Sequence, residues 1–93
     1  MHAVFVVSEL NPSRATEAET MLKTRIAPQI KQAPGFVTAT WARSADGKEG
    51  RSMVVFETEE AARTTLASVT KGMPPDGPVK IISTSVLEVV HQV

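Results

Sequence analysis

The stretch FVTATWARSADGKEGRSMVVFETEE, residues 36–60, decides the fold of this chain. It predicts two strands, Phe36 to Arg43 and Ser52 to Glu57, and the Asp46-Gly47 dipeptide between them is typical of hairpin turns. Thr58 predicts the start of a helix, because threonine is a good N-cap and the acids after it lie at the positive end of the helix dipole. The stretch therefore predicts a β-hairpin that leads directly into a helix.

The segments on either side of this hairpin complete a β-α-β-β-α-β order. Residues 3–7 (Ala-Val-Phe-Val-Val) predict a first strand that is buried on both faces. Asn11-Pro12 predicts the start of the first helix, and Pro28 predicts a break or kink in it because proline lacks a backbone donor. Residues 79–93 predict a last strand, with a bend or bulge at 83–85 because this segment exceeds the usual strand length.

These elements predict the α+β fold class. Their order is that of the ferredoxin-like βαββαβ fold, an antiparallel sheet with its helices on one face. A chain of 93 residues has the length of one domain, so we expect residues 1–93 to form a single ferredoxin-like domain.

The composition is that of an ordinary globular protein and argues against several classes of function. Ten basic residues balance ten acidic ones without a cluster of either sign, so we expect no nucleic-acid or membrane partner. The chain has no cysteine and only two histidines, His2 and His91, so we expect no metal site. No apolar run approaches the ~20 residues that span a bilayer, and no signal segment is visible. We therefore expect a cytoplasmic protein without a cofactor.

The strands are apolar on both faces, although the helices are expected to cover only one. Residues 3–7 are apolar at every position, so both sides of the first strand are apolar. If the hairpin pairs symmetrically about its loop, Trp41 lies beside Met53 and Val55 on the face opposite Phe56. Monomers rarely leave so large an apolar face open. We therefore expect a homodimer that packs two open sheet faces about a twofold axis, with Trp41, Met53 and Val55 in its interface.

Three features along the chain resemble a known family. They are the interrupted first helix that runs into Pro34-Gly35-Phe36, Trp41 in the second strand, and the third strand that passes through residues 56–61 into the second helix. Together they resemble the dimeric α+β-barrel superfamily, and within it the antibiotic-biosynthesis-monooxygenase-like group, over the whole chain. The resemblance implies a barrel of two sheets, with a pocket between helices and sheet in each subunit. Activities in that group include cofactor-independent monooxygenation that makes quinones, and haem degradation.

Two positions matter for what this resemblance implies about activity. Active members of similar layout carry an asparagine near the end of the first strand and a tryptophan at the end of the third. Ser8 stands at the first position, or Asn11 if the alignment is shifted, and Phe56 stands at the second. The second helix has no histidine and the chain has no tyrosine, which disfavours haem degradation of the known kind. A monooxygenase stays open as an alternative, because that chemistry depends on pocket shape as well as on fixed residues.

The leading hypothesis is a homodimeric barrel protein that binds a small apolar or aromatic molecule between its helices and sheet. The residues predicted to line this pocket are Ser8, Leu22, Ile26, Phe56 and Leu66. One alternative is a cofactor-independent monooxygenase that acts on an aromatic substrate in the same pocket. Another is a structural or regulatory dimerisation domain without an open pocket, and a pocket volume of about 300 Å³ or more would argue against it.

Several polar and aromatic residues allow both a functional and a structural interpretation, and none is singled out as catalytic. Trp41 can stack on an aromatic ligand or anchor the dimer interface. Glu19 can reach into the pocket as a base, or pair at its rim with the lysine four residues later. Arg43, Lys48 and Arg51 around the hairpin loop can hold an acidic ligand group, or simply be solvated.

Overall fold

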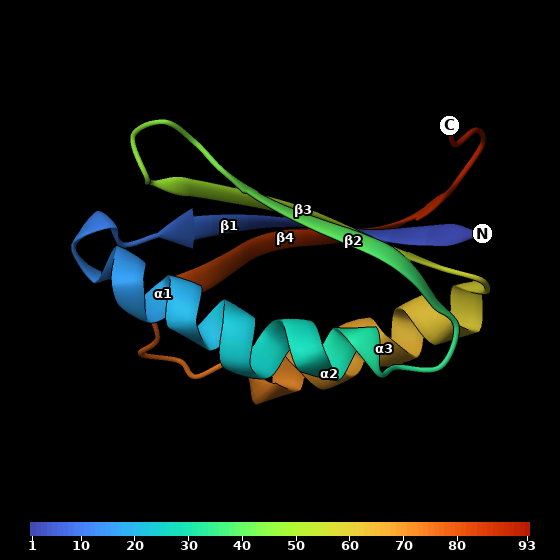
Figure 1. Ribbon diagram of the computed structural model, residues 1–93, viewed down its shortest axis with the longest axis horizontal. Helices are drawn as coiled ribbons and strands as arrows, with labels where there is room; N and C mark the ends of the chain where they lie inside the picture. The colour runs from blue at the N-terminus through green and yellow to red at the C-terminus, as the bar shows by residue number, and fades with distance from the viewer.

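The computed structural model describes all 93 residues and contains one four-stranded antiparallel sheet with its helices on one face (Figure 1). The order across the sheet is β2-β3-β1-β4, so β1 and β3 are its central strands. The strands are β1 (His2–Leu10), β2 (Phe36–Arg43), β3 (Glu49–Phe56) and β4 (Val79–Glu88), and the α-helices are α1 (Ala15–Met21), α2 (Ala27–Lys31) and α3 (Glu59–Gly72). The predicted α+β class and ferredoxin-like order are confirmed.

Both helical runs begin at the predicted capping residue. The side-chain oxygen of Asn11 accepts a hydrogen bond from the backbone N–H of Ser13 at 3.0 Å, at the head of a 3-10 turn, Pro12–Arg14, that leads into α1. The hydroxyl of Thr58 accepts from the backbone N–H of Ala61 at 3.1 Å. Each side chain satisfies a donor that the first helical turn would otherwise leave unpaired.

A π-helical turn, Leu22–Ile26, joins α1 to α2 in one continuous run. In this turn the backbone N–H of Ala27 bonds to the carbonyl of Leu22, five residues earlier. Pro28 follows at once, and a proline ring in a regular helix clashes with the carbonyl four residues before it. The wider turn relieves this clash. The interruption predicted at Pro28 is therefore a π turn upstream of the proline, and the helix continues to Lys31.

The last strand is shorter than predicted. β4 ends at Glu88 and not at Val93, because its only neighbour, β1, begins at His2 directly opposite Glu88. Beyond that pair one backbone hydrogen bond continues the pairing, from the Val89 N–H to the Met1 carbonyl at 2.9 Å. The predicted bulge is present but lies slightly earlier than residues 83–85, since the register of β1 and β4 shifts so that Ile82 has no partner.

The register of the hairpin differs from the predicted one. Trp41 on β2 pairs with Ser52 on β3, whereas symmetric pairing about the loop predicts that it lies beside Met53 and Val55. A slip of one residue moves a side chain to the other face of the sheet. The prediction that Trp41 lies beside Met53 and Val55 is therefore wrong. Trp41 lies on the helix-facing side together with Phe56.

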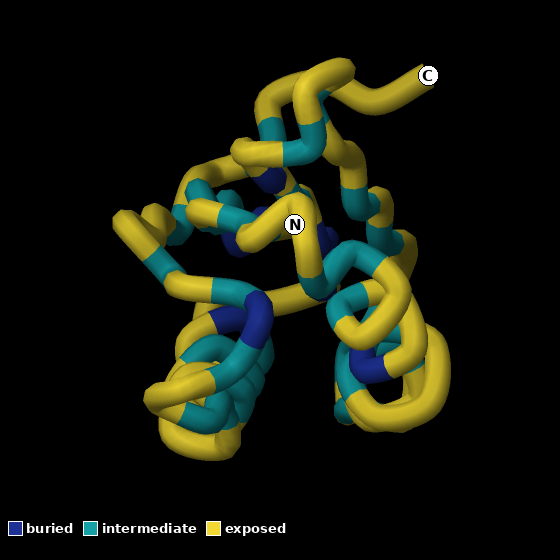
Figure 2. Tube along the Cα trace, turned by 90° about the vertical axis from the view of Figure 1, so that its left-hand side faces the viewer, coloured by how far each residue is buried: buried dark blue, intermediate teal, exposed yellow.

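The core lies between the sheet and the helices. Phe56 is the largest fully buried side chain, with 0% of its surface exposed, and it packs in a cluster with Val4, Ile30, Val54 and Ala62. Figure 2 shows that the buried positions are few and lie in the sheet and on the inner parts of the helices. The small core is expected, because a chain of this length buries a limited share of its surface.

The opposite face of the sheet has no helix over it (Figure 1). Strand alternation places Phe5, Met53, Val55 and Leu87 on this face, which we call the open face. Met53 and Leu87 are each 43% exposed, whereas Val55 is only 5% exposed because neighbouring side chains already cover it. Of the three residues predicted for a dimer interface, Met53 and Val55 are on the open face and Trp41 is not.

Candidate functional site

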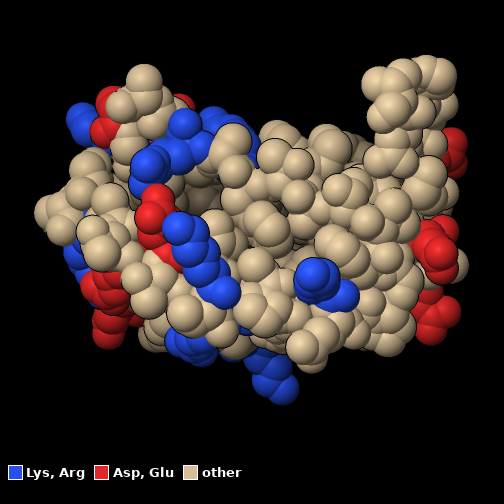
Figure 3. Space-filling view, viewed as in Figure 1, with Lys and Arg blue, Asp and Glu red and all other residues tan.

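A cavity of about 480 Å³ lies between the helix-facing side of the sheet and the helical layer. Residues from all four strands and from both helical runs line it, and 16 of the 24 lining residues are hydrophobic. Figure 3 shows a hollow near the hairpin end of the sheet, with basic and acidic side chains beside it. Sites for small organic molecules are of this size, and they are mainly apolar with a few polar groups.

All five residues predicted for the pocket line this cavity. Ser8 comes from β1, Phe56 from β3, Leu22 and Ile26 from the π turn, and Leu66 from α3. The strand residues face the helices because of the two-residue period of each strand, and the helix residues lie on one stripe. The structure therefore brings the five together in space.

The alternative of a shifted alignment, with Asn11 in place of Ser8, is not supported by the geometry. Asn11 does not line the cavity, and its side chain caps the first helical run through Ser13. Ser8 is the polar residue near the end of β1 that lines the cavity.

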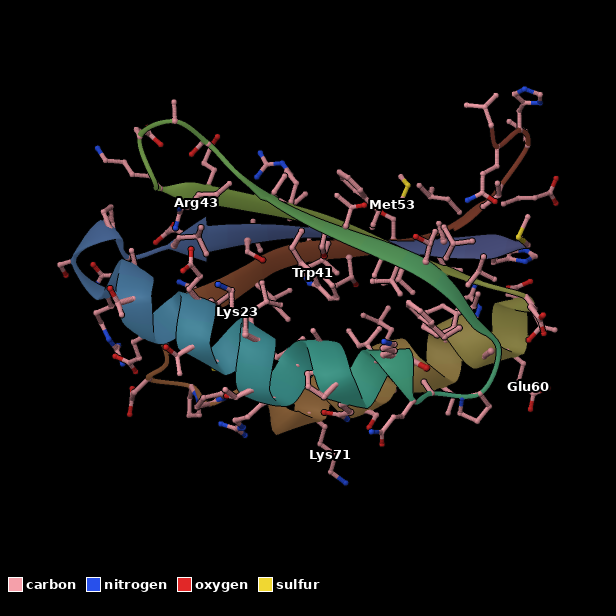
Figure 4. All side chains as sticks on the ribbon, viewed as in Figure 1. Lys23, Trp41, Arg43, Met53, Glu60 and Lys71 are labelled. Atoms are coloured by element: carbon pink, nitrogen blue, oxygen red, sulfur yellow. The ribbon has the colours of Figure 1, made fainter.

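Trp41, Ser52 and Thr65 also line the cavity and were not among the predicted pocket residues. Figure 4 shows Trp41 between the sheet and the helices, and Met53 on the other side of the sheet. A signal for Ser52 was present in the sequence, because it shares a two-residue period with Phe56. Trp41 could have been found only by knowing the hairpin register.

Four half-buried polar groups in the cavity wall have no partner within the chain. The hydroxyls of Ser8, Ser52 and Thr65 and the indole N–H of Trp41 take part in none of the side-chain hydrogen bonds. Ser52 pairs directly with Trp41 across β2 and β3. Half-buried polar groups gain from a partner, so these four are available to an oxygen atom of a ligand.

Charged side chains gather at one end of the cavity. Glu19 on α1 lies between two cations: its Oε1 is 3.8 Å from Nη1 of Arg43 and its Oε2 is 3.7 Å from Nζ of Lys23. Figure 4 shows Arg43 at the hairpin end of β2 and Lys23 on the helical run below it. Glu19 thus lines the cavity and pairs with the lysine at its rim, with its side chain 51% exposed and not buried. We call Glu19, Lys23 and Arg43 the charged rim.

Clear pKa shifts occur at surface ion pairs and turns. The hydrogen bond from Arg14 lowers the pKa of Glu17, and the hydrogen bond from the Ser44 hydroxyl, at 2.6 Å, lowers the pKa of Asp46 in the hairpin turn. Arg63 likewise lowers the pKa of Glu59 in the first turn of α3. None of these residues lines the cavity, so the shifts stabilise local structure and do not mark a catalytic group.

Similarity to known proteins is visible in the fold and not in the sequence. No protein-family model matches the chain, and no curated protein matches it. The haem degrader MhuD from Mycobacterium tuberculosis, with two haems in its active site, is 19% identical, with a TM-score of 0.75 over 100% of this chain and 99% of its own. The monooxygenase ActVA-Orf6 from Streptomyces coelicolor, in complex with nanaomycin D, is 17% identical, with a TM-score of 0.66 over 99% of this chain and 89% of its own. SnoaB, a cofactor-independent oxygenase from Streptomyces nogalater, is 18% identical, with a TM-score of 0.69 over 99% of this chain and 96% of its own.

The chain shares the ferredoxin-like α+β fold of these proteins and of a putative antibiotic biosynthesis monooxygenase from Deinococcus radiodurans. The resemblance inferred from the sequence is confirmed at the level of the fold. At identities of 17–19% the likeness concerns the fold alone.

The cavity lacks the side chains that most often hold a haem through its iron. Those side chains are histidine, cysteine and tyrosine, whereas methionine serves as a ligand together with histidine. The lining contains no histidine, cysteine or tyrosine, and its only methionine is Met73. His2 and His91 both lie outside the cavity, and nowhere do three or more His, Asp or Glu side chains come together as a metal site. No helix is long and apolar enough to cross a membrane.

Proposed function

We propose that the chain is a homodimer that binds a small, mainly apolar or aromatic molecule in the cavity between helices and sheet. The observation that carries this proposal is the cavity itself, about 480 Å³ in volume with two thirds of its lining residues hydrophobic. That volume exceeds the ~300 Å³ at which sites for small ligands begin. It argues against a purely structural domain without an open pocket.

A pair of neighbouring threonines on α3 offers a sharp test of ligand binding. Thr65 lines the cavity, whereas Thr64 is exposed and does not. A phenylalanine at position 65 places a ring in the cavity and narrows it, and the same substitution at position 64 adds the same ring to the outer side of the helix. The probe is N-phenyl-1-naphthylamine, a neutral aromatic dye, and the readout is energy transfer from Trp41, the only tryptophan.

We expect the unmodified chain and Thr64→Phe to bind the dye equally, and Thr65→Phe to bind at least about tenfold more weakly because its ring occupies the dye's space. Absence of energy transfer in the unmodified chain would count against the proposal. Equal binding by both variants would place the dye elsewhere on the protein.

The homodimer is supported by the open face. Met53 and Leu87 expose apolar surface there, and Phe5 is half-buried beside them. Exposed apolar patches of this kind mark interfaces, and a twofold pair would cover both faces at once. Native mass spectrometry should give twice the chain mass of 10.0 kDa. Met53→Glu should shift the population to monomer, whereas the same charge at Thr64 should not, and a monomeric unmodified chain would contradict the proposal.

A second candidate is a cofactor-independent monooxygenase that acts on an aromatic substrate. The observation that favours it is the set of four unpartnered polar groups on the wall of an apolar cavity, where they can orient an aromatic hydroxyl or carbonyl. ActVA-Orf6 and SnoaB, which share the fold, are described as a monooxygenase and a cofactor-independent oxygenase. Oxygen uptake with a phenolic substrate, lost in Thr65→Phe and retained in Thr64→Phe, would support it. If a phenolic compound binds in the cavity but causes no oxygen uptake, monooxygenation of that compound is excluded.

A further inference from the structure

The charged rim lies where an otherwise apolar cavity meets solvent. Glu19 and Arg43 are lining residues of the cavity, and Lys23 pairs with Glu19 from one helical turn further on. In Figure 3 acidic and basic side chains flank the hollow on the helix side and on the sheet side. A ligand that fills the cavity therefore has its outer end beside this rim.

The ion pairs of the rim are loose. The two N···O distances, 3.7 Å and 3.8 Å, are longer than the ~3.2 Å limit of a good N–H···O hydrogen bond. All three side chains are about half or more exposed, and exposed pairs of this kind contribute little to stability. A ligand group can displace Glu19 from Arg43 at small cost to the fold.

The rim has one more positive charge than negative charge, and the Arg43 guanidinium forms no hydrogen bond within the chain. Arginine offers five donors in a planar fork that matches the two oxygens of an acid group. Of the other hairpin cations, Lys48 does not line the cavity. Arg51 does line it, but strand alternation places its side chain with Met53 on the open face, where its guanidinium donates to the Gly50 carbonyl at 2.9 Å and lies 3.8 Å from Glu49.

We propose that the cavity selects an organic anion: a small apolar or aromatic body with one acid group, which Arg43 binds in place of Glu19. The inference rests on the proposed ligand-binding function and narrows it to a chemical class. Lys23 adds a second positive charge on the helix side of the bound acid group. Glu19 holds Arg43 at the rim while the cavity is empty and competes with the incoming anion.

Two dyes with the same ring skeleton test the inference. 8-Anilinonaphthalene-1-sulfonate carries one acid group, and N-phenyl-1-naphthylamine is the same molecule without it. Both are titrated against the unmodified chain, Arg43→Gln and Glu19→Gln, with energy transfer from Trp41 as the readout, and Thr65→Phe separates dye in the cavity from dye bound elsewhere on the chain. Lys48→Gln is the matched control, because it removes a positive charge from the hairpin loop outside the cavity.

We expect Arg43→Gln to weaken binding of the anionic dye about tenfold, and Glu19→Gln to strengthen it several-fold because the competing carboxylate is gone. Lys48→Gln should change the affinity by less than about twofold, and the neutral dye should be indifferent to all three substitutions. Higher salt should weaken only the anionic dye.

The two proposals fail in different ways. If neither dye accepts energy from Trp41, the proposed ligand-binding function fails. If the neutral dye binds while Arg43→Gln and Lys48→Gln affect the anionic dye equally or not at all, the anion inference is overturned and the ligand-binding function stands.

Discussion

Truncation of Phe56 to alanine should be the most destabilising single change in the core. The side chain has no exposed surface, and its ring meets that of Phe36 edge to face, with centroids 6.5 Å apart and an interplanar angle of 79°. Phenylalanine-to-alanine changes at buried positions cost ~3–5 kcal/mol, of which an aromatic pair accounts for ~0.5–1.5 kcal/mol. The ring is fully enclosed, so we expect the free energy of unfolding to fall by about 4 kcal/mol, in the middle of that range.

The assay is urea unfolding followed by far-ultraviolet circular dichroism at a fixed protein concentration, because dimerisation would make the midpoint concentration-dependent. A chain of this length has a free energy of unfolding of roughly 5–14 kcal/mol, so the variant should remain folded but shift to a clearly lower midpoint. Phe56→Leu, which keeps most of the apolar volume, should lose less than about 1.5 kcal/mol. A loss below about 1 kcal/mol for the alanine variant, with an unchanged m-value, would refute the placement of Phe56 at the centre of the core.

Three further predictions concern local structure. Gly35→Ala should lower the free energy of unfolding by ~1–2 kcal/mol in the same assay, because Gly35 has a φ of 81° and a methyl group there would lie 3.1 Å from a side chain of α3. The control is Gly72→Ala, where a methyl group would meet nothing within 4 Å, so the free energy of unfolding should stay the same or rise by up to ~1 kcal/mol. Thr58→Ala should lower the free energy of unfolding by about 1 kcal/mol because it removes the N-cap of α3, and Thr58→Ser, which keeps a capping hydroxyl, should not. The hydrogen bond from Arg63, at 2.8 Å, holds the pKa of Glu59 below its ordinary 4.5. The pair therefore stabilises the fold above pH 4.5, and this contribution is lost as the pH falls through the lower pKa that Glu59 has in the folded chain. Arg63→Gln should raise the Glu59 pKa toward 4.5 in a titration followed by NMR, and an unmoved pKa would contradict this assignment.

Local signals in the sequence were sufficient for the elements and their order. The strand Phe36–Arg43 has the predicted bounds, and α3 begins after Thr58 as its capping chemistry requires. Both features depend on residues close together in the chain. The same is true of Leu66 and Phe56, which face the cavity because each lies on the apolar side of its own helix or strand.

Features that depend on pairing between distant residues could not be read in this way. Whether Trp41 lies opposite Ser52 or Met53 changes with a single residue of register, and the loop sequence allowed either. The end of β4 at Glu88 is set by where β1 begins, not by the β-propensity of residues 89–93. The charged rim likewise needs the hairpin end of β2 and the helical run containing Glu19 to be brought together.

The π turn also determines how straight the helical wall of the cavity is. In a regular α-helix, residues four apart differ by about 40° in direction, so a row at that spacing winds steadily around the axis. Leu22, Ile26 and Ile30 form such a row, yet all three line the cavity. The π turn over Leu22–Ile26 rotates less per residue and reverses part of this drift. The wider turn before Pro28 thus keeps all three side chains of the row on the cavity side of the helical run.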